Sequence, residues 1–211
     1  MASLDTLQLV TLAAALGWAS GLRLYAVLFV VGLVGHYGWY PLPSGLQLLA
    51  HPAVLVTSGT LLAVEFVADK VPWFDSLWDG VHTFIRVPAG ALLAAGVFGD
   101  AGGATAMVAA LLGGGLAAGS HLTKAGTRAL ANTSPEPVSN WSLSLGEDAL
   151  VGGGLFLAFT LPWLFLALLL LLILLAAWLL PKLLRALAGF WRRLRGRGED
   201  RESGKPRRPH V

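Results

Sequence analysis

Twelve ionisable side chains lie in or beside long apolar segments of this 211-residue chain. An ionised group at the centre of a membrane-spanning helix costs roughly 2.5–3.5 kcal/mol on insertion scales, so such groups need partners or a purpose. Carboxylates and histidines in such positions bind cations or relay protons, and neighbouring Lys and Arg residues set their charge state. The candidate binding or relay residues are Glu65, Asp69, Asp75, Asp79, His82, Glu147 and Asp148, and the candidate charge partners are Arg23, Arg86, His121, Lys124 and Arg128.

The spacing predicts which of these side chains share a helix face, because residues three, four or seven apart lie on one side of a helix. Glu65 and Asp69 form an acidic pair four residues apart. Two longer stripes follow, an i, i+4, i+7, i+11 series of Asp75, Asp79, His82 and Arg86, and an i, i+3, i+7 series of His121, Lys124 and Arg128.

The two longer stripes should meet. A short turn at Asp100–Gly103 joins their segments, so the segments pack antiparallel, and at about 1.5 Å per residue both stripes lie roughly 26–32 Å from that turn. One stripe is mainly acidic and the other mainly basic, so we expect them to pair. Three interpretations stay open: a solvated or structural ion-pair cluster at a helix end, a functional polar site that lines a cavity, or an unpaired accident.

Arg23 lies near the middle of the first apolar segment, beside Ser20 and Gly21. Its side chain is roughly 25 Å from either end of that segment, too far to reach water easily. We expect a carboxylate partner, and Glu65 is the best candidate. The alternative is that the segment consists of two half-helices that meet at Ser20-Gly21, with Arg23 exposed at the junction. Broken helices of this kind form binding sites in transporters.

Glu147 and Asp148 open the last long apolar segment, after Ser144. One interpretation is a helix N-cap followed by acids in the first turn, which the helix dipole favours. The other is a second acidic site comparable with the earlier pair. A faint internal repeat supports the second interpretation, because residues 19–24 resemble residues 117–122 and each stretch precedes a loop and an acidic pair. Such repeats often flank a site near the membrane midplane.

Enzymatic interpretations are weak. The chain has no His-Glu-x-x-His, phosphate-cradling glycine loop or Gly-x-Ser-x-Gly motif, so no catalytic residue and no cofactor are predicted. It also has no cysteine, which excludes thiolate chemistry and Cys-ligated metals. His82 and His121 could join Asp79 and Glu65 as metal ligands, but the spacing does not demand it, so a metal is left undetermined.

The composition indicates a bilayer protein, because 55% of the residues are hydrophobic, 13% are charged and the mean hydropathy is +0.68. The apolar runs are too long and do not alternate, which excludes a transmembrane barrel. The predicted fold class is an all-α, polytopic transmembrane helix bundle with broken helices and an internal pseudo-repeat. The approximate spans are residues 6–36, 48–69, 74–99, 104–131 and 149–180, the last either tilted or broken at Pro162.

The basic residues are concentrated in the C-terminal segment. Ten of the fifteen Lys and Arg residues lie from Lys182 onward, whereas residues 1–181 carry a net charge of −4. The basic balance is therefore not a nucleic-acid footprint. We expect residues 181–211 to form a basic amphipathic segment on anionic lipid headgroups, followed by a disordered end after Gly196. Basic flanks stay cytoplasmic, which places the C-terminus inside; the side of the N-terminus depends on whether there are five or six spans.

Two blocks of polar and aromatic residues carry a family resemblance. The first comprises residues 65–72, Asp75, Trp78-Asp79 and residues 83–90, and the second comprises residues 121–125, Arg128, residues 132–134, Asn140, Ser144 and Glu147-Asp148, with Ser20-Gly21 and Tyr25 in the first segment. This pattern resembles an uncharacterised bacterial membrane family catalogued as domain of unknown function 4126. The resemblance covers roughly residues 5–180 and implies a polytopic inner-membrane protein. It brings no activity, but it implies that the polar positions are a family pattern.

The leading hypothesis is a transporter or channel for a small ion or solute, in particular a proton-coupled cation carrier. The runner-up is a structural or lipid-interacting membrane protein, and an intramembrane enzyme is third; a homo-oligomer is left open. Transport predicts a wet cavity near mid-membrane that reaches the acids. The structural hypothesis predicts that every buried charge is paired and that no cavity exists. In the transport hypothesis, the groups that bind or relay charge are Glu65, Asp69, Asp79 and Glu147, and their partners are Arg23, Lys124 and Arg128.

Overall fold

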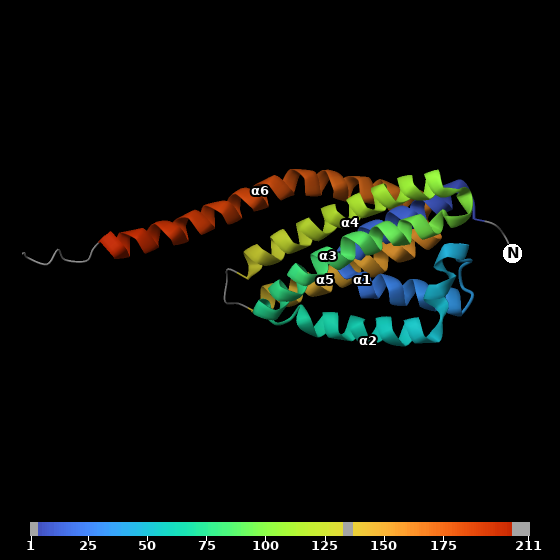
Figure 1. The fold of residues 1–211 in the computed structure, drawn as a ribbon, viewed down its shortest axis with the longest axis horizontal. Coiled ribbons are helices and arrows are strands. Elements are labelled where there is room, and N and C mark those ends of the chain that lie inside the picture. Colours follow the sequence, from blue (N-terminus) through green and yellow to red (C-terminus); the bar gives the residue numbers. More distant parts are fainter. Residues whose placement is uncertain (1–3, 133–136, 204–211) are drawn as a thin grey trace, which may run out of the picture.

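The computed structural model describes residues 4–132 and 137–203, and this part of the chain contains helices and turns without a strand. The expected all-α fold is therefore confirmed (Figure 1). The elements, in chain order, are α1 (Thr6–His36), η1 (Ser44–Ala50), α2 (Pro52–Ala68), α3 (Pro72–Val97), η2 (Gly99–Ala101), α4 (Gly103–Ala131), α5 (Pro137–Thr160) and α6 (Pro162–Ser203).

Helix α1 is a hairpin rather than a straight span. Arg23 leaves the helical conformation, with φ −143° and ψ 77°. A straight helix of 31 residues would separate its two ends by about 46 Å, yet Leu9 and Gly35 line the same cavity. The two arms, residues 6–22 and 24–36, therefore enter and leave at one end of the bundle, with Arg23 at the tip (Figure 1).

Residues 6–36, predicted as one span, form a candidate membrane-spanning helix by length and composition, but the break at Arg23 folds it back on itself. We therefore expect this segment to be re-entrant rather than to cross the membrane once. The segment is broken into two helices as the half-helix alternative expected, but the break lies at Arg23 rather than at Ser20-Gly21, and Arg23 is buried. Helices α2 to α6 then run back and forth between the two ends of the bundle (Figure 1), and α2 is extended by η1 through a 70° bend.

Small residues let the first arm of α1 pack closely against α3 and α4. A Cβ atom added to Gly17 would lie 2.7 Å from the Cα atom of Gly113. A Cβ atom on Gly90 would lie 2.5 Å from the Ser20 hydroxyl oxygen. Helices in lipid associate through such close contacts, because lipid tails offer no hydrophobic drive for burying larger side chains. The close fit fixes the depth of the hairpin tip.

The predicted span 149–180 is two helices. Helix α5 begins at Pro137 and ends at Thr160, and α6 begins at Pro162. Proline lacks an N–H group and disfavours helical conformation in the residue before it, which explains the break. Helix α6 continues to Ser203 and extends beyond the bundle (Figure 1), so the expected disorder after Gly196 is wrong as far as Ser203. Residues 204–211 lie outside the described part.

The outward surface of the helices is apolar. Large hydrophobic side chains such as Val56, Phe84, Leu111, Trp163 and Leu170 are more than half exposed. A contiguous apolar surface of this kind on long helices marks a lipid-facing protein. The chain is therefore a multi-pass membrane protein, as the length and apolar composition of α3, α4, α5 and α6 also indicate.

The hairpin makes a testable prediction about topology, because the sequence contains no native cysteine. Single cysteines introduced as Thr6→Cys and Tyr37→Cys should react with a membrane-impermeant maleimide from the same side of sealed, oriented vesicles. Trp141→Cys, at the other end of the bundle, should react from the opposite side. If Thr6→Cys and Tyr37→Cys label from opposite sides, α1 crosses the membrane and the hairpin is wrong.

Candidate functional site

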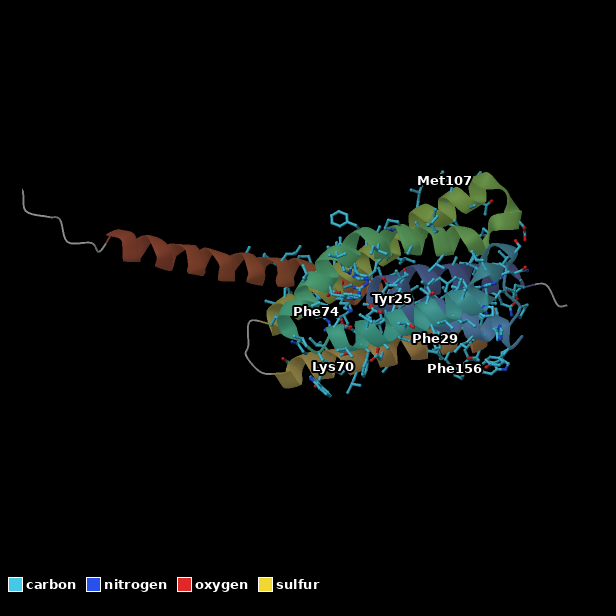
Figure 2. The ribbon with its side chains drawn as sticks, turned by 60° about the horizontal axis from the view of Figure 1, so that its bottom comes forward. Tyr25, Phe29, Lys70, Phe74, Met107 and Phe156 are labelled. Atoms are coloured by element: carbon cyan, nitrogen blue, oxygen red, sulfur yellow. The ribbon has the colours of Figure 1, made fainter. Side chains whose placement is uncertain are left out.

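Charged side chains from five helices meet around the tip of the α1 hairpin. They lie toward the end of the bundle where α2 joins α3, which is the end where Figure 2 labels Lys70. The described ion pairs join four cations and five carboxylates into one group, here called the charged cluster. Its members are Arg23, Glu65, Asp69, Asp79, Arg86, Lys124, Arg128, Glu147 and Asp148.

Arg23 connects the hairpin tip to α2 and α5. Its side chain is fully buried, with Nη1 2.5 Å from Asp69 Oδ2 and Nε 3.0 Å from Asp148 Oδ1. Its Nη2 donates to the Ser144 hydroxyl oxygen at 2.7 Å and to the Ser144 carbonyl oxygen at 3.1 Å. The expected partner, Glu65, is wrong, because the break turns Arg23 toward the last turn of α2 and leaves Glu65 to another arginine. The expected exposure at the junction is also wrong.

Arg86 is the second buried arginine of the cluster, and it connects α2, α3 and α4. Its Nη2 donates to Glu65 Oε1 at 2.6 Å, and its Nη1 donates to Asp79 Oδ1 at 2.7 Å. Nη1 also lies 3.2 Å from Nδ1 of His121. Glu65 and Asp79 therefore share one cation.

Lys124 lies at the centre of the cluster. Its Nζ is 3.1 Å from Glu147 Oε2 and 3.4 Å from Asp69 Oδ2, and it lies 3.8 Å from Asp79 Oδ1. It also donates to the carbonyl oxygen of Leu22 at 3.1 Å. That carbonyl is available because the helix breaks at the next residue. The ammonium group thus sits among oxygen atoms from three carboxylates and one backbone group.

Arg128 holds the outermost layer of the cluster together. Its Nε and Nη2 donate to the two carboxylate oxygens of Glu147 at 2.9 and 2.8 Å, a bidentate geometry that fixes both groups. Its Nη1 donates to the backbone carbonyl oxygen of Asp69 at 3.0 Å. The same guanidinium therefore pairs with α5 and satisfies the end of α2.

His121 is neutral in this network. Its Nδ1 faces Arg86 Nη1, which can only donate, so Nδ1 is an acceptor. Its Nε2 lies 2.7 Å from the hydroxyl oxygen of Thr83, whose own proton goes to the carbonyl oxygen of Asp79. The hydrogen bonds therefore assign one proton to the ring, on Nε2.

The hydrogen bonds of His82 assign a proton to one of its ring nitrogens. Its Nδ1 lies 2.7 Å from the carbonyl oxygen of Trp78, which can only accept, so the ring proton is on Nδ1. Its Nε2 lies 3.0 Å from the hydroxyl oxygen of Tyr25. Tyr25 and His82 form a short hydrogen-bonded chain on the flank of the cluster.

The cluster has one more carboxylate than cations. With all nine of its members ionised, its net charge is −1. Three carboxylate oxygens are buried without a hydrogen-bond partner among the described residues: Glu65 Oε2, Asp69 Oδ1 and Asp79 Oδ2. Buried polar atoms normally find a partner, so these three oxygens can still accept one; Arg23 Nε and Nη1 and Arg86 Nε also lack a partner with hydrogen-bond geometry in the described part of the chain.

The edge of the cluster lies at Asp148 and Lys70. The Asp148 side chain is 32% exposed, whereas Arg23 and Asp69 beside it are fully buried. Lys70 follows α2, and its Nζ lies over the Phe66 ring and donates to the Phe66 carbonyl oxygen at 2.9 Å. Burial lowers the pKa of Lys70, and the nearby Arg23 lowers it further. This edge is where the buried charges approach solvent.

The predicted pairing of the α3 and α4 stripes is confirmed, because Asp79 and Arg86 meet Lys124 and His121 across the helix pair. The side chain of Asp75 lies outside the described residues. The N-cap interpretation of Glu147 and Asp148 is wrong, since α5 starts ten residues earlier at Pro137. These two acids do not form a separate site either, because they join the same cluster as Asp69.

The two stretches of the faint repeat lie against each other. A Cβ atom on Gly21 would collide with the Ser120 hydroxyl and the Ala117 carbonyl, and the Ser120 hydroxyl donates to the carbonyl oxygen of Trp18 at 2.7 Å. The stretches differ in conformation, however, because α1 breaks at Arg23 whereas α4 is continuous through His121.

Some members of the site were not singled out as site residues from the sequence. Ser144 binds Arg23, and Thr83 binds His121. The sequence held a signal for Ser144, since Asn140, Ser144 and Glu147 follow the same i, i+4, i+7 spacing as the other stripes. No spacing rule indicates the Leu22 carbonyl, because its availability depends on the break.

The cavities described for the bundle lie apart from the cluster. None of the three cavities described for the bundle is lined by a charged member of the cluster. Among the described residues, no group of three or more His, Asp or Glu side chains is placed to hold a metal ion. The wet mid-membrane cavity that transport predicts is therefore not among these three cavities.

A family model described as Domain of unknown function (DUF4126) matches residues 10–182. The chain belongs to this family. The resemblance to domain of unknown function 4126 is thereby confirmed, and the match includes every member of the charged cluster while excluding most of the basic C-terminal segment. No curated protein and no solved structure is detectably similar to the chain.

Proposed function

We propose that this DUF4126 protein carries a small cation across the membrane in exchange or symport with protons, and that the charged cluster is the coupling site. The charge balance carries the proposal: five carboxylates face four cations inside a bundle with an apolar outer surface. An uncompensated carboxylate there favours a bound proton or cation, because burying a bare charge is costly.

Stability alone gives little reason to keep such a cluster. Replacing buried ion pairs with well-packed apolar residues is often neutral or stabilising. Three carboxylate oxygens of the cluster also lack hydrogen-bond donors. A purely structural network would be more stable if each of these oxygens accepted a hydrogen bond. Buried charges that are costly to place in a membrane and that lack some of their hydrogen bonds are typical of a site that exchanges a proton or an ion.

Lys124 supports a cation as the cargo. Its ammonium group is surrounded by oxygens of Leu22, Glu147 and Asp69 at 3.1–3.4 Å, which is an oxygen set of the kind that hard cations take. A backbone carbonyl at a helix break is also how broken transporter helices coordinate ions. A cation from solution would compete with this lysine for the same oxygens.

Glu65 is the residue we assign to the proton. Arg86 is its partner among the described ion pairs, and Arg86 is shared with Asp79. Protonation of Glu65 would remove the ion pair that ties α2 to α3 while Asp79 keeps the arginine compensated. Helix α2 starts after a 70° bend, so its far end is the part that can swing and open the cluster.

The proposal is tested with purified protein in liposomes that contain a pH-sensitive dye. An inward gradient of K⁺ or Na⁺ should drive a proton flux above that of protein-free vesicles. Glu65→Gln keeps the shape of the side chain but cannot ionise, so it should lower this flux at least about tenfold. Glu199→Gln, the same change outside the family match, should leave the flux unchanged. Equal flux in Glu65→Gln and the unaltered protein would contradict the assignment.

A structural role is the second candidate, and one observation favours it: each of the four cations lies within 4 Å of a carboxylate. The same experiment separates the two. If the unaltered protein gives no flux of protons, K⁺ or Na⁺ above the protein-free vesicles, transport of these ions is abandoned. The cluster would then serve to hold the five helices together.

We further propose that the basic C-terminal segment lies on the cytoplasmic side of the inner membrane and contacts anionic lipid headgroups. Ten Lys and Arg residues lie from Lys182 onward, against three acids. Basic flanks stay on the cytoplasmic side and bind anionic lipid there. In this orientation the charged cluster lies in the cytoplasmic half of the bundle.

A further inference from the structure

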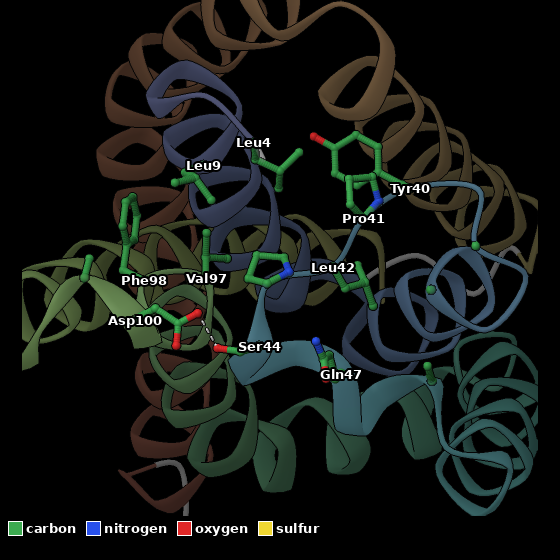
Figure 3. A pocket seen from close by; sticks show the side chains of 15 residues that line it. Leu4, Leu9, Tyr40, Pro41, Leu42, Ser44, Gln47, Val97, Phe98 and Asp100 are labelled. Atoms are coloured by element: carbon green, nitrogen blue, oxygen red, sulfur yellow. Dashed lines mark hydrogen bonds between the residues drawn. The ribbon is translucent and has the colours of Figure 1, made fainter. Parts of the chain in front are cut away.

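A second polar site lies at the opposite end of the bundle from the charged cluster. A cavity of about 940 Å³ opens where the two ends of α1 meet η1 and the turn between α3 and α4 (Figure 3). Pockets of about 300–1,000 Å³ are typical of small-molecule sites. Apolar side chains make most of its wall, including Leu4, Leu9, Leu42, Val97 and Phe98.

Few polar side chains line the cavity, and the formal charge among them is negative. Asp100 is the one residue among those lining the cavity that carries a formal charge, and no Lys, Arg or His is among them. The Ser44 hydroxyl donates to Asp100 Oδ2 at 2.7 Å, which fixes the carboxylate on the cavity wall (Figure 3). Asp100 can therefore receive a cationic group from the cavity.

Tyr40 gives an independent indication of a ligand. Its ring packs against Phe159 at 4.8 Å between centroids, and its hydroxyl oxygen is buried without a hydrogen-bond partner among the described residues. Burial raises the pKa of Tyr40, and the charge of Asp5 raises it further, so the hydroxyl stays neutral and keeps its proton. A buried donor without an acceptor is normally satisfied by solvent or by a ligand.

The cavity lies at the level where the membrane meets water. Tyr37 and Trp39 follow α1, are 62% and 72% exposed, and stack at 5.1 Å between centroids. Exposed aromatic residues at helix ends mark the membrane interface. An amphipathic molecule that concentrates at this interface can enter the cavity directly.

We propose that this cavity binds a primary ammonium group attached to an apolar body. The ammonium group pairs with Asp100, and the apolar body packs against the leucine and phenylalanine side chains. Such a group is found on free arylalkyl amines and on the headgroup of phosphatidylethanolamine. The site is separate from the charged cluster, and its occupancy does not require transport.

The test measures binding of phenethylammonium chloride by titration calorimetry to the full chain in nanodiscs of phosphatidylcholine and phosphatidylglycerol. 2-Phenylethanol, which has the same apolar body without the charge, is the matched ligand control and should bind at least about tenfold more weakly. Asp100→Asn should weaken phenethylammonium binding at least about tenfold, whereas Asp100→Glu should retain it. Leu42→Trp, which fills the cavity and keeps the carboxylate, should also weaken binding.

A second arm distinguishes the two sources of the ligand. The protein is taken from nanodiscs that contain equal amounts of phosphatidylethanolamine and phosphatidylcholine, and is measured by native mass spectrometry. If the ligand is a lipid, phosphatidylethanolamine should stay bound to the unaltered protein and should be lost from Asp100→Asn. Either ligand supports the proposal when its binding depends on Asp100. Equal binding of phenethylammonium and 2-phenylethanol together with no preference for phosphatidylethanolamine overturns it, as does full binding to a folded Asp100→Asn protein. Glu65→Gln should leave this binding unchanged even where it abolishes flux, so the two proposals fail separately.

Discussion

Arg23→Met should destabilise the protein by about 3–5 kcal/mol, because it leaves buried carboxylates without their cation. Arg23 is 0% exposed and pairs with Asp69 and Asp148, and it also binds Ser144. Methionine fills a similar volume, so the expected loss comes from charge rather than from a void. The measurement is the thermal or denaturant unfolding of purified protein in detergent, with monodispersity on a sizing column as a second readout.

The matched control is Arg185→Met, because Arg185 is exposed on α6 and its described hydrogen bond goes to the Pro181 carbonyl oxygen of its own helix. This change should alter stability by no more than about 0.5 kcal/mol. Adding Asp69→Asn to Arg23→Met removes one of the stranded charges and should recover part of the loss. Unfolding of Arg23→Met at the same temperature as the unaltered protein would show that the hairpin tip is not held by its charge.

Gly21→Ala should destabilise the protein by about 3 kcal/mol, the upper end of what overpacking costs. The new methyl group would collide with the Ser120 hydroxyl and the backbone carbonyl of Ala117, and the backbone atom cannot turn away. The first arm of α1 would have to shift, and Arg23 would shift with it. The expected result is a lower unfolding temperature together with lower proton flux in liposomes.

Gly119→Ala is the matched control for this prediction. Gly119 lies in α4 close to the same contact, but a Cβ atom there meets nothing within 4 Å. Alanine is a better helix former than glycine by roughly 1 kcal/mol, so this change should be neutral or stabilising. If both changes have the same effect, helix propensity rather than close packing controls this region.

The meeting of α3 with α4 could be predicted from the sequence because it depends on local rules. Asp79 and Arg86 share a face by spacing, Lys124 and His121 share another, and a short turn makes the two helices antiparallel neighbours. These rules predict which side chains pair and how far the pairs lie from the turn between the two helices. The structure then gives the distance, 3.2 Å between Arg86 Nη1 and His121 Nδ1.

The partner of Arg23 could not be predicted in the same way. Two carboxylates one turn apart on α2, Glu65 and Asp69, were both within reach of a residue near the middle of the first segment. The choice between them depends on how far the hairpin tip reaches, which the close contact of Gly17 with Gly113 decides. Tertiary packing of this kind has no signature in spacing or composition.

The start of α5 was missed because its first turns are polar. Asn140, Ser144 and Glu147 point into the bundle, so hydropathy alone places the start of this helix too late. Their i, i+4, i+7 spacing is the same signal that identified the other stripes. Polar residues that serve a buried site thus hide a membrane helix from a search based on apolar runs.

The break at Arg23 also sets the order in which the protein can be assembled. The first hydrophobic segment leaves the ribosome with its arginine, while the carboxylates that neutralise it follow only at residues 69 and 148. Until then the nascent hairpin holds a charge that lipid disfavours. We therefore expect the hairpin to reach its final depth only after α5 has been synthesised, because Asp148 lies in that helix.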